Sequence, residues 1–183
     1  MLTDILQVIN EISAKAKDSI IGLGEQLACK FMTAVLRDQG IDAEFVSLAD
    51  IVPEQEYDEM GSGTLSQDFY DHLTVALGER INACGRRVPV VTGFFGSVPG
   101  SLLSQIGRGY TDLCSALLAV GLEAAELQIW KEVDGIFTAD PRKVVTARVI
   151  PIISPDEAAE LTYYGSEVVH PFTMEQVRIG YGA

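Results

Sequence analysis

The chain has 183 residues, of which 48% are hydrophobic and 21% charged, a composition typical of one soluble globular domain with a sizeable core. Its formal net charge of -13 argues against nucleic acid and anionic membranes as partners, because both would repel it. A local cluster of arginine and lysine could still bind an anionic small molecule, because salt screens distant charges beyond about 10 Å.

The opening residues and the cysteines both indicate the cytoplasm. MLTDILQVINE has no basic segment ahead of its apolar residues, and no run approaches the roughly 18 apolar residues of a membrane span. Cys29, Cys84 and Cys114 show neither a CxxC nor a Cys/His spacing, so we expect free thiols and no metal site. His72 and His170 lack partner spacing for a metal or a catalytic triad and are interpreted as structural.

Apolar residues in the first half of the chain recur at spacings that indicate helices and one strand. The second predicted helix carries Leu27, Phe31, Ala34 and Val35 on one face and ends at Gly40, a residue type suited to a helix C-terminus. An acidic, glycine-containing stretch indicates a mobile loop. The helices are expected at residues 2–12, 20–40 and 66–85, the strand at 43–48 and the loop at 53–66.

Strands and helices continue to alternate in the second half. VPVVT (residues 88–92) and LQIW (residues 127–130) are short apolar runs typical of buried parallel strands. Ser154 and Glu157 form a capping box around Pro155, which predicts a helix from there. The alternation indicates an α/β fold, a three-layer α/β/α sandwich with a mostly parallel sheet, in a single domain over residues 1–183. Ligands bind such sheets where strands end and helices begin.

A glycine-rich segment joins the strand at 88–92 to the next helix. It holds Gly93, Gly96, Gly100, Gly107 and Gly109, and Arg108 lies between the last two. Ordering such a loop costs much backbone conformational entropy. So many glycines therefore suggest that its backbone must approach a ligand or another segment closely. GRGYTD, at 107–112, therefore has two interpretations. It is either a glycine turn before a helix capped by Thr111 or Asp112, or an anion site at a helix start with a guanidinium beside it.

Two further segments carry charged candidates. Lys131, Arg142 and Lys143 lie in KEVDGIFTADPRK, where each is either a solvated surface charge or one of several cations that flank a triphosphate. Glu25 lies near the start of the second helix, where it is either a helix-dipole acid or an acceptor for a substrate ammonium group.

Several of these segments, in this order, resemble aspartokinases of the amino-acid kinase family, the fungal ones most closely. GLGEQLACKFMTAVLRDQG resembles the segment that supplies a substrate-binding glutamate. VPVVTGFFGSVPG and GRGYTD resemble the loops that hold aspartate and phosphates, and IWKEVDGIFTADPRKV resembles the nucleotide-binding segment. DEAAELTYYGSEVVHPFTMEQV resembles the helix pair that follows. The resemblance implies ATP-dependent phosphorylation of the β-carboxylate of aspartate, with ATP and Mg²⁺ as cofactors.

The resemblance also implies roles for individual residues. Glu25 would bind the α-ammonium of aspartate, Arg108 would bind its α-carboxylate, and Thr111 and Asp112 would line the same pocket. Glu25, Arg108 and Asp112 are the candidate catalytic residues, and no metal-ligating residue is expected. This favours the anion-site interpretation of GRGYTD. The nucleotide would be contacted by Gly93, Gly96, Lys131, Glu132, Phe137 and Arg142.

The sequence departs from the family pattern in three places. The K-F-G-G-T-S loop, whose lysine contacts the phosphates, and the C-terminal ACT domains have no counterpart in it. We therefore expect a partial amino-acid kinase-like domain in which phosphoryl transfer is impaired or lost, because that step depends on charge neutralisation and positioning. Gly22 and Leu23 stand where the family usually carries serine or threonine before G-E, which predicts a wider and more apolar substrate pocket.

These departures leave two other hypotheses for the function. The pocket could bind a larger carboxylic acid and promote its cyclisation or rearrangement, with Arg108 polarising a carboxylate and Glu25 or Asp112 moving protons. Alternatively, the chain is a non-catalytic binding relic. An unpaired sheet edge and the family's habit of pairing kinase domains predict a homodimer.

Overall fold

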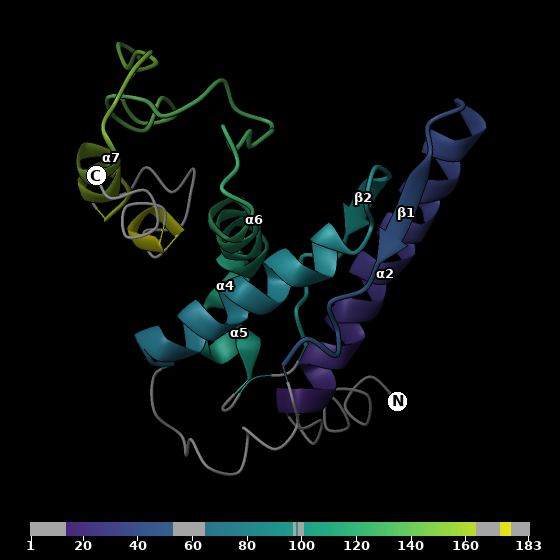
Figure 1. Cartoon of the computed structure of the whole chain (residues 1–183). Coiled ribbons are helices and arrows are strands. Elements are labelled where there is room, and N and C mark those ends of the chain that lie inside the picture. The colour runs from purple at the N-terminus through teal and green to yellow at the C-terminus, as the bar shows by residue number, and fades with distance from the viewer. Residues whose placement is uncertain (1–13, 53–64, 97, 99–100, 164–172, 177–183) are drawn as a thin grey trace, which may run out of the picture. The chain divides into compact units, whose positions relative to one another are not determined.

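The computed structural model describes residues 14–52, 65–96, 98, 101–163 and 173–176 (Figure 1). The predicted opening helix at 2–12 and most of the predicted loop at 53–66 lie outside them. The chain divides into two compact units, Met1–Tyr110 and Thr111–Ala183, which are described in turn. The helices are α2 (Ala14–Asp38), α4 (Gln67–Asn82), α5 (Leu102–Gln105), η1 (Gly107–Gly109), α6 (Tyr110–Gly121) and α7 (Pro155–Tyr163), and the strands are β1 (Ala43–Val46) and β2 (Val88–Val91).

The first unit is built on a parallel pair of strands connected through α4. β1 and β2 pair from Ala43 opposite Val88 to Val46 opposite Val91. Beyond the strands, the hydroxyl of the buried Thr92 accepts a hydrogen bond from the Leu48 backbone N–H at 3.0 Å and so joins the two carboxyl ends. The predicted strands at 43–48 and 88–92 are thus confirmed. β2 is half-buried rather than buried, and Val88 is 46% exposed.

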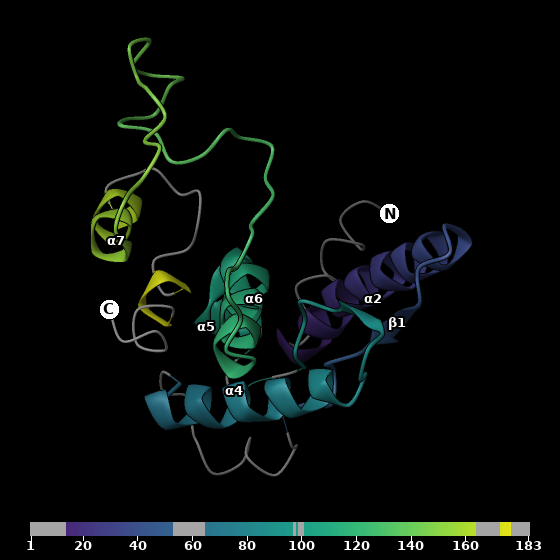
Figure 2. The same ribbon diagram turned by 45° about the horizontal axis from the view of Figure 1, so that its top comes forward.

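Helix α2 packs on one face of this strand pair, and the turn that ends α4 reaches the other. Figures 1 and 2 show α2 alongside β1, where the Arg37 Nε donates to the Ala43 carbonyl at 2.7 Å and the Lys30 ammonium lies 5.4 Å from the Phe45 ring. Glu44 points to the opposite face, where burial and then the Glu44 carboxylate raise the pKa of the Cys84 thiol at the end of α4. The α/β class with a parallel sheet is therefore confirmed.

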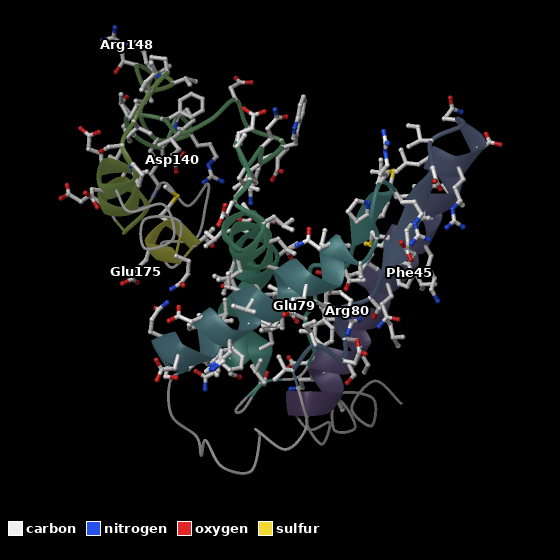
Figure 3. All side chains as sticks on the ribbon, viewed as in Figure 1. Phe45, Glu79, Arg80, Asp140, Arg148 and Glu175 are labelled. Atoms are coloured by element: carbon white, nitrogen blue, oxygen red, sulfur yellow. The ribbon has the colours of Figure 1, made fainter. Side chains whose placement is uncertain are left out.

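Helix α4 fits its sequence prediction closely. Ser66 caps its N-terminus by accepting from the Phe69 backbone N–H at 3.3 Å, and Gly85 follows its end with a φ of +63°. Its inner face is apolar, with Leu77 fully buried. Figure 3 labels Arg80, which donates from α4 to the Ser47 carbonyl at 3.0 Å and so anchors the helix to the loop after β1.

Helix α2 presents its apolar face outward. Leu27 and Phe31, on the apolar face that the sequence predicts, are 68% and 71% exposed, whereas Asp18 and Thr33 on the other side are 1% and 4% exposed. The inner side carries small and polar residues because the helix lies close to the strands and the loop after β2. By length and composition alone, α2 is long and apolar enough to cross a membrane. Core helices of soluble proteins and signal sequences meet the same two criteria.

In the second unit the predicted strand at 127–130 is absent, which corrects the sequence prediction. These residues form no strand in the described structure, and Trp130 is 89% exposed. A strand exists only when a neighbour supplies its hydrogen bonds, so an apolar run alone does not make one. The capping box is confirmed, because the Ser154 backbone N–H donates to Glu157 at 3.0 Å and the Glu157 backbone N–H donates to the Ser154 hydroxyl at 3.3 Å.

We predict that Leu77→Ala lowers the free energy of unfolding by about 2–5 kcal/mol, because it leaves a cavity in the core. Val75, on the same helix, is 61% exposed, so Val75→Ala should change it by less than about 0.5 kcal/mol. Urea denaturation of both variants measures the difference. Equal effects would contradict the burial of this face of α4.

Burial raises the pKa of Tyr70 to about 12. Tyrosine in an unfolded chain ionises near about pH 10, so between these values the native state holds this proton more tightly than the unfolded state. The contribution to stability is therefore complete below about pH 10 and is lost as the pH rises above it. We expect the unfolding free energy of the wild type to fall more steeply with pH in this window than that of Tyr70→Phe, measured by urea titrations. Parallel pH profiles would contradict the buried hydroxyl.

Candidate functional site

In the first unit, the carboxylate of Glu25 is bound by Tyr110, which follows Gly109 in GRGYTD. The Tyr110 hydroxyl donates to Glu25 Oε1 at 2.5 Å, and Tyr110 itself is only 5% exposed. The ring of Phe94 packs edge-on against Tyr110, with ring centroids 6.5 Å apart. The Glu25 carboxylate therefore has a fixed orientation set by a buried phenol. Tyr110 was missed by the sequence analysis, although it adjoins predicted site residues in GRGYTD.

One turn further along α2, Cys29 joins the helix to the end of β2. Its thiol donates to the Val91 carbonyl at 3.3 Å. Burial, and then the negative charge of Glu25, raise the pKa of this thiol. Cys29 is therefore a protonated structural group beside Glu25 rather than a thiolate nucleophile.

The space above Gly22 is filled, which corrects the prediction of a wider pocket there. A Cβ added to Gly22 would lie 2.6 Å from the ring of Phe94, which is 5% exposed. Gly22 thus admits an aromatic ring of this chain rather than a bulky ligand. Leu23, the other residue behind the prediction, is 56% exposed.

The glycine-rich loop after β2 is fixed by packing against the loop after β1. Gly96 is buried with a φ of +95°, and an added Cβ would lie 2.7 Å from the Ala49 carbonyl oxygen. The positive φ and the short distance to the carbonyl oxygen both require glycine at this position. Gly93, the other predicted nucleotide residue here, is half-buried. Phe94 and Phe95 are both buried and are part of the core.

A buried aspartate in α2, Asp18, binds the start of α5, the short helix that precedes GRGYTD. Asp18 accepts from the Ser101 hydroxyl at 2.9 Å and from the Leu102 backbone N–H at 2.7 Å, and it is 1% exposed. Ser101 has a φ of +83°, a strained value for a residue with a side chain. Asp18 thus ties α2 to α5, which leads into η1. The sequence held no spacing signal for this contact across more than eighty residues.

GRGYTD itself forms η1 and the start of α6. Arg108 lies in η1, and Gly107 has a φ of +75°. Helix α6 begins at Tyr110, so Thr111 and Asp112 are in its first turn. The interpretation of either residue as the N-cap is therefore wrong. An acid in a first turn is also favoured by the helix dipole.

In the second unit, two predicted site residues are brought together. The Lys131 ammonium lies 2.7 Å from Asp112 Oδ2, and the two side chains are 29% and 19% exposed. Lys131 follows the run at 127–130, whereas Asp112 is in the first turn of α6. The resemblance implies a substrate contact for Asp112 and a nucleotide contact for Lys131, but it did not predict that the two residues pair. Their ion pair therefore places a predicted substrate residue next to a predicted nucleotide residue in this unit.

The segment after Lys131 folds back on itself in a short antiparallel pairing, which we call the clamp. Phe137 pairs with Val149, and the Thr138 backbone N–H donates to the Arg148 carbonyl at 2.9 Å. Phe137 is half-buried and Glu132 is exposed on the chain leading into the clamp. Figure 3 labels Arg148 in this segment.

Asp140 organises the turn of this clamp and was missed by the sequence analysis. Arg142 donates to it from the Nε at 3.1 Å and from the backbone N–H at 2.9 Å, and the Lys143 ammonium lies 3.9 Å away. The guanidinium of Arg142 holds the pKa of Asp140 below its usual value. Figure 3 labels Asp140. The Asp-Pro pair at 140–141, a turn signal, could have pointed to it.

No group of three or more histidine, cysteine, aspartate or glutamate side chains gathers in the described part of the chain in a way that could hold a metal ion. The second unit has an open, largely apolar hollow of about 360 Å³ that contains none of the predicted site residues. Its lining comprises Ile150, Ile152, Ile153, Glu157, Glu160 and Leu161.

A sequence profile of the amino acid kinase family matches residues 3–181. The chain belongs to this family. The aspartokinase of Schizosaccharomyces pombe is 63% identical over 94% of this chain and 32% of its own length, and that of Candida albicans is 54% identical over 93% and 32%. Escherichia coli aspartokinase III, solved in complex with aspartate and ADP, matches with a TM-score of 0.76 and 25% identity over 93% of this chain and 37% of its own.

These comparisons confirm the resemblance to fungal aspartokinases and the amino acid kinase fold. The chain spans about a third of the length of the curated relatives it matches. The roles of the individual amino acid kinase site residues remain predictions.

We predict opposite effects for two glycines of α2. Gly22→Ala should lower the unfolding free energy by about 1–3 kcal/mol, because its methyl group overlaps the Phe94 ring. Nothing lies within 4 Å of a Cβ added to Gly24, so Gly24→Ala should raise stability by up to about 1 kcal/mol through helix propensity. Urea denaturation of the two variants gives the comparison. A stabilised Gly22→Ala variant would instead support an open pocket at this point.

Proposed function

We propose that this chain carries substrate-binding and nucleotide-binding elements of an aspartokinase, in the reaction that transfers the γ-phosphoryl group of ATP to the β-carboxylate of aspartate. The observation that carries the proposal is the 63% identity to a fungal aspartokinase over 94% of the chain. The bacterial neighbour was solved with aspartate and ADP, which supports the same pair of ligands here. ADP is the product that ATP leaves in this reaction.

The proposed chemistry is an in-line displacement at phosphorus. A β-carboxylate oxygen of aspartate forms a bond to the γ-phosphorus of ATP while the bond to the ADP oxygen breaks. Catalysis of such a step rests on positioning and charge neutralisation. Glu25 would accept hydrogen bonds from the α-ammonium of aspartate. The Tyr110 hydroxyl, 2.5 Å from Glu25 Oε1, supports this role because it orients the carboxylate.

Arg108 would bind the α-carboxylate as a planar two-pronged donor, a geometry that suits guanidinium and carboxylate groups. Gly107 on one side of it has a φ of +75°, and Gly109 on the other also lacks a side chain, so neither neighbour obstructs the approach of a ligand. Thr111 and Asp112 would complete the contacts to aspartate from the first turn of α6.

Lys131 would neutralise charge on the nucleotide phosphates. In the free protein its ammonium is already balanced by Asp112 at 2.7 Å, so a phosphate oxygen would compete for a cation that is held in place. Arg142 would approach the nucleotide from a turn in which its side chain is 89% exposed. Solvent screens the exposed Arg142–Asp140 pair, so Arg142 is available to a phosphate at small cost.

The remaining nucleotide contacts would come from Gly93, Gly96, Glu132 and Phe137. Mg²⁺ commonly binds proteins through one or two carboxylates together with substrate phosphates. In this proposal the metal ion would be carried by the nucleotide. Mg²⁺ would supply further neutralisation of the phosphates. We also propose a cytoplasmic location and a homodimer.

The alternative of a larger, partly apolar acid as substrate has weaker support. It relied on extra space at Gly22, and the Phe94 ring occupies that space. The Asp112–Lys131 ion pair instead suits charged ligands. A small dicarboxylic amino acid is therefore the substrate class that we propose.

Calorimetry with ADP and with aspartate tests the proposal. Lys131→Met should weaken ADP binding by at least about 10-fold, because a charge-assisted contact is worth about 1.5–3 kcal/mol. Arg108→Ala should weaken aspartate binding by a similar factor. The matched control Lys17→Met, at an exposed lysine of α2 outside the predicted site, should change neither. Wild-type protein that binds neither ligand would overturn the proposal. A coupled ADP-release assay with ATP, aspartate and Mg²⁺ then measures phosphoryl transfer directly.

A further inference from the structure

Two carboxylates of α2 bind the two ends of the segment that carries Arg108. At one end, Asp18 accepts a hydrogen bond from the Leu102 backbone N–H at 2.7 Å. At the other end, Glu25 accepts one from the Tyr110 hydroxyl at 2.5 Å. Positions 18 and 25 are two helical turns apart, so both carboxylates lie on the same side of α2, roughly 10 Å apart along its axis. One rigid helix therefore sets the separation of the two ends of this segment.

The contact at Asp18 is buried and caps α5 from another helix. Asp18 is 1% exposed, and its second oxygen accepts from the Ser101 hydroxyl at 2.9 Å. Leu102 is the first residue of α5. The N–H of a first helical residue lacks an acceptor within its own helix, and the helix dipole favours a negative charge beside it. The Asp18 carboxylate supplies both the acceptor and the charge.

Ser101 has a backbone conformation that needs an anchor of this kind. Its φ of +83° and ψ of +133° lie outside the regions that residues with a side chain favour. Residues persist in such conformations only where their surroundings hold them, and they cluster at functional sites. The bonds that Asp18 accepts from Ser101 and Leu102 hold the chain at this point.

Helical hydrogen bonding connects this anchor to η1. The Ile106 backbone N–H donates to the Leu102 carbonyl at 2.9 Å, and the two residues are 5% and 0% exposed. Gly107 follows directly, with a φ of +75°. A backbone with glycine on both sides of Arg108 has wide conformational freedom unless its ends are fixed. The contacts of Asp18 and Glu25 fix them.

We propose that Asp18 is a positioning residue of the aspartate site, which sets through α5 where η1 presents Arg108 relative to Glu25. This inference rests on the proposed function, in which Arg108 binds the α-carboxylate and Glu25 the α-ammonium of one ligand. Both of these groups are attached to the same carbon atom of aspartate. A small displacement of η1 would therefore prevent the two contacts from forming together.

Calorimetry of the full chain tests the proposal. Asp18→Ala should weaken aspartate binding at least about 10-fold and change ADP binding less than about 2-fold. Asp18→Asn should bind aspartate within about 3-fold of the wild type, because its amide keeps an oxygen for the Leu102 N–H and an N–H for the Ser101 hydroxyl oxygen. Asp38→Ala, at an exposed aspartate of α2, is the matched control and should change neither affinity. Equal losses for aspartate and ADP in Asp18→Ala would contradict the positioning role.

Far-UV circular dichroism checks that each variant keeps its helices. Ser101→Ala covers the case in which Asp18→Ala does not fold, because it removes one of the two bonds to Asp18 and keeps the other. It should weaken aspartate binding about 2–5-fold. An unchanged affinity in Ser101→Ala, together with an unfolded Asp18→Ala variant, would make Asp18 a residue of the fold alone and overturn the proposal.

A double-mutant cycle separates positioning from a general loosening of the fold. In an Arg108→Ala background, Asp18→Ala should cost less than about 2-fold in aspartate affinity, because the group that it positions is gone. Additive losses would overturn the proposal. A wild type that binds no aspartate would overturn the proposed function and this inference together, whereas equal aspartate binding by the wild type and Asp18→Ala would overturn this inference alone.

Hydrogen exchange of the ligand-free chain provides a readout that does not depend on substrate. Asp18→Ala should speed amide exchange in residues 102–110 at least about 10-fold and leave α4 unchanged, because the anchor of α5 is lost. Unchanged exchange in 102–110 would show that Asp18 does not hold this segment and would overturn the proposal.

Discussion

The contact between Gly22 and the ring of Phe94 fixes how α2 sits on the first unit. Only a glycine lets the ring approach the helix this closely, since an added Cβ would lie 2.6 Å from it. The same ring packs against Tyr110, whose hydroxyl holds Glu25. The orientation of the proposed substrate-binding carboxylate therefore depends on a backbone-to-ring contact three residues earlier in the same helix.

This close approach explains the composition of both sides of α2. The inner side uses small or hydrogen-bonding residues, such as Asp18, Cys29 and Thr33, because the strands and the following loops leave little room. Large apolar residues are consequently placed on the outer side. One helix thus holds the proposed substrate-binding carboxylate on its inner side and presents apolar residues on its outer side.

Three cations of the second unit have anionic partners in the described part of the chain. Lys131 is balanced by Asp112, and Arg142 and Lys143 by Asp140. Pairing keeps cations in defined positions in an acidic protein while leaving Arg142 exposed. A phosphate ligand would then exchange one anionic partner for another, which costs less than ordering a free side chain.

The sequence by itself determined the features that depend on neighbouring residues. Ser66 and the Ser154–Glu157 capping box mark helix starts because their bonds form within three or four residues, and the apolar runs at 43–48 and 88–92 proved to be paired strands. The roles of Glu25, Arg108, Asp112 and Lys131 are predictions that the resemblance implies. Only the tertiary structure decided which side of α2 is buried and that residues 127–130 form no described strand. It also decided that Tyr110 binds Glu25, that Asp18 binds the start of α5 and that Asp140 binds Arg142. These outcomes depend mainly on contacts with distant segments, whose geometry is not encoded in local periodicity.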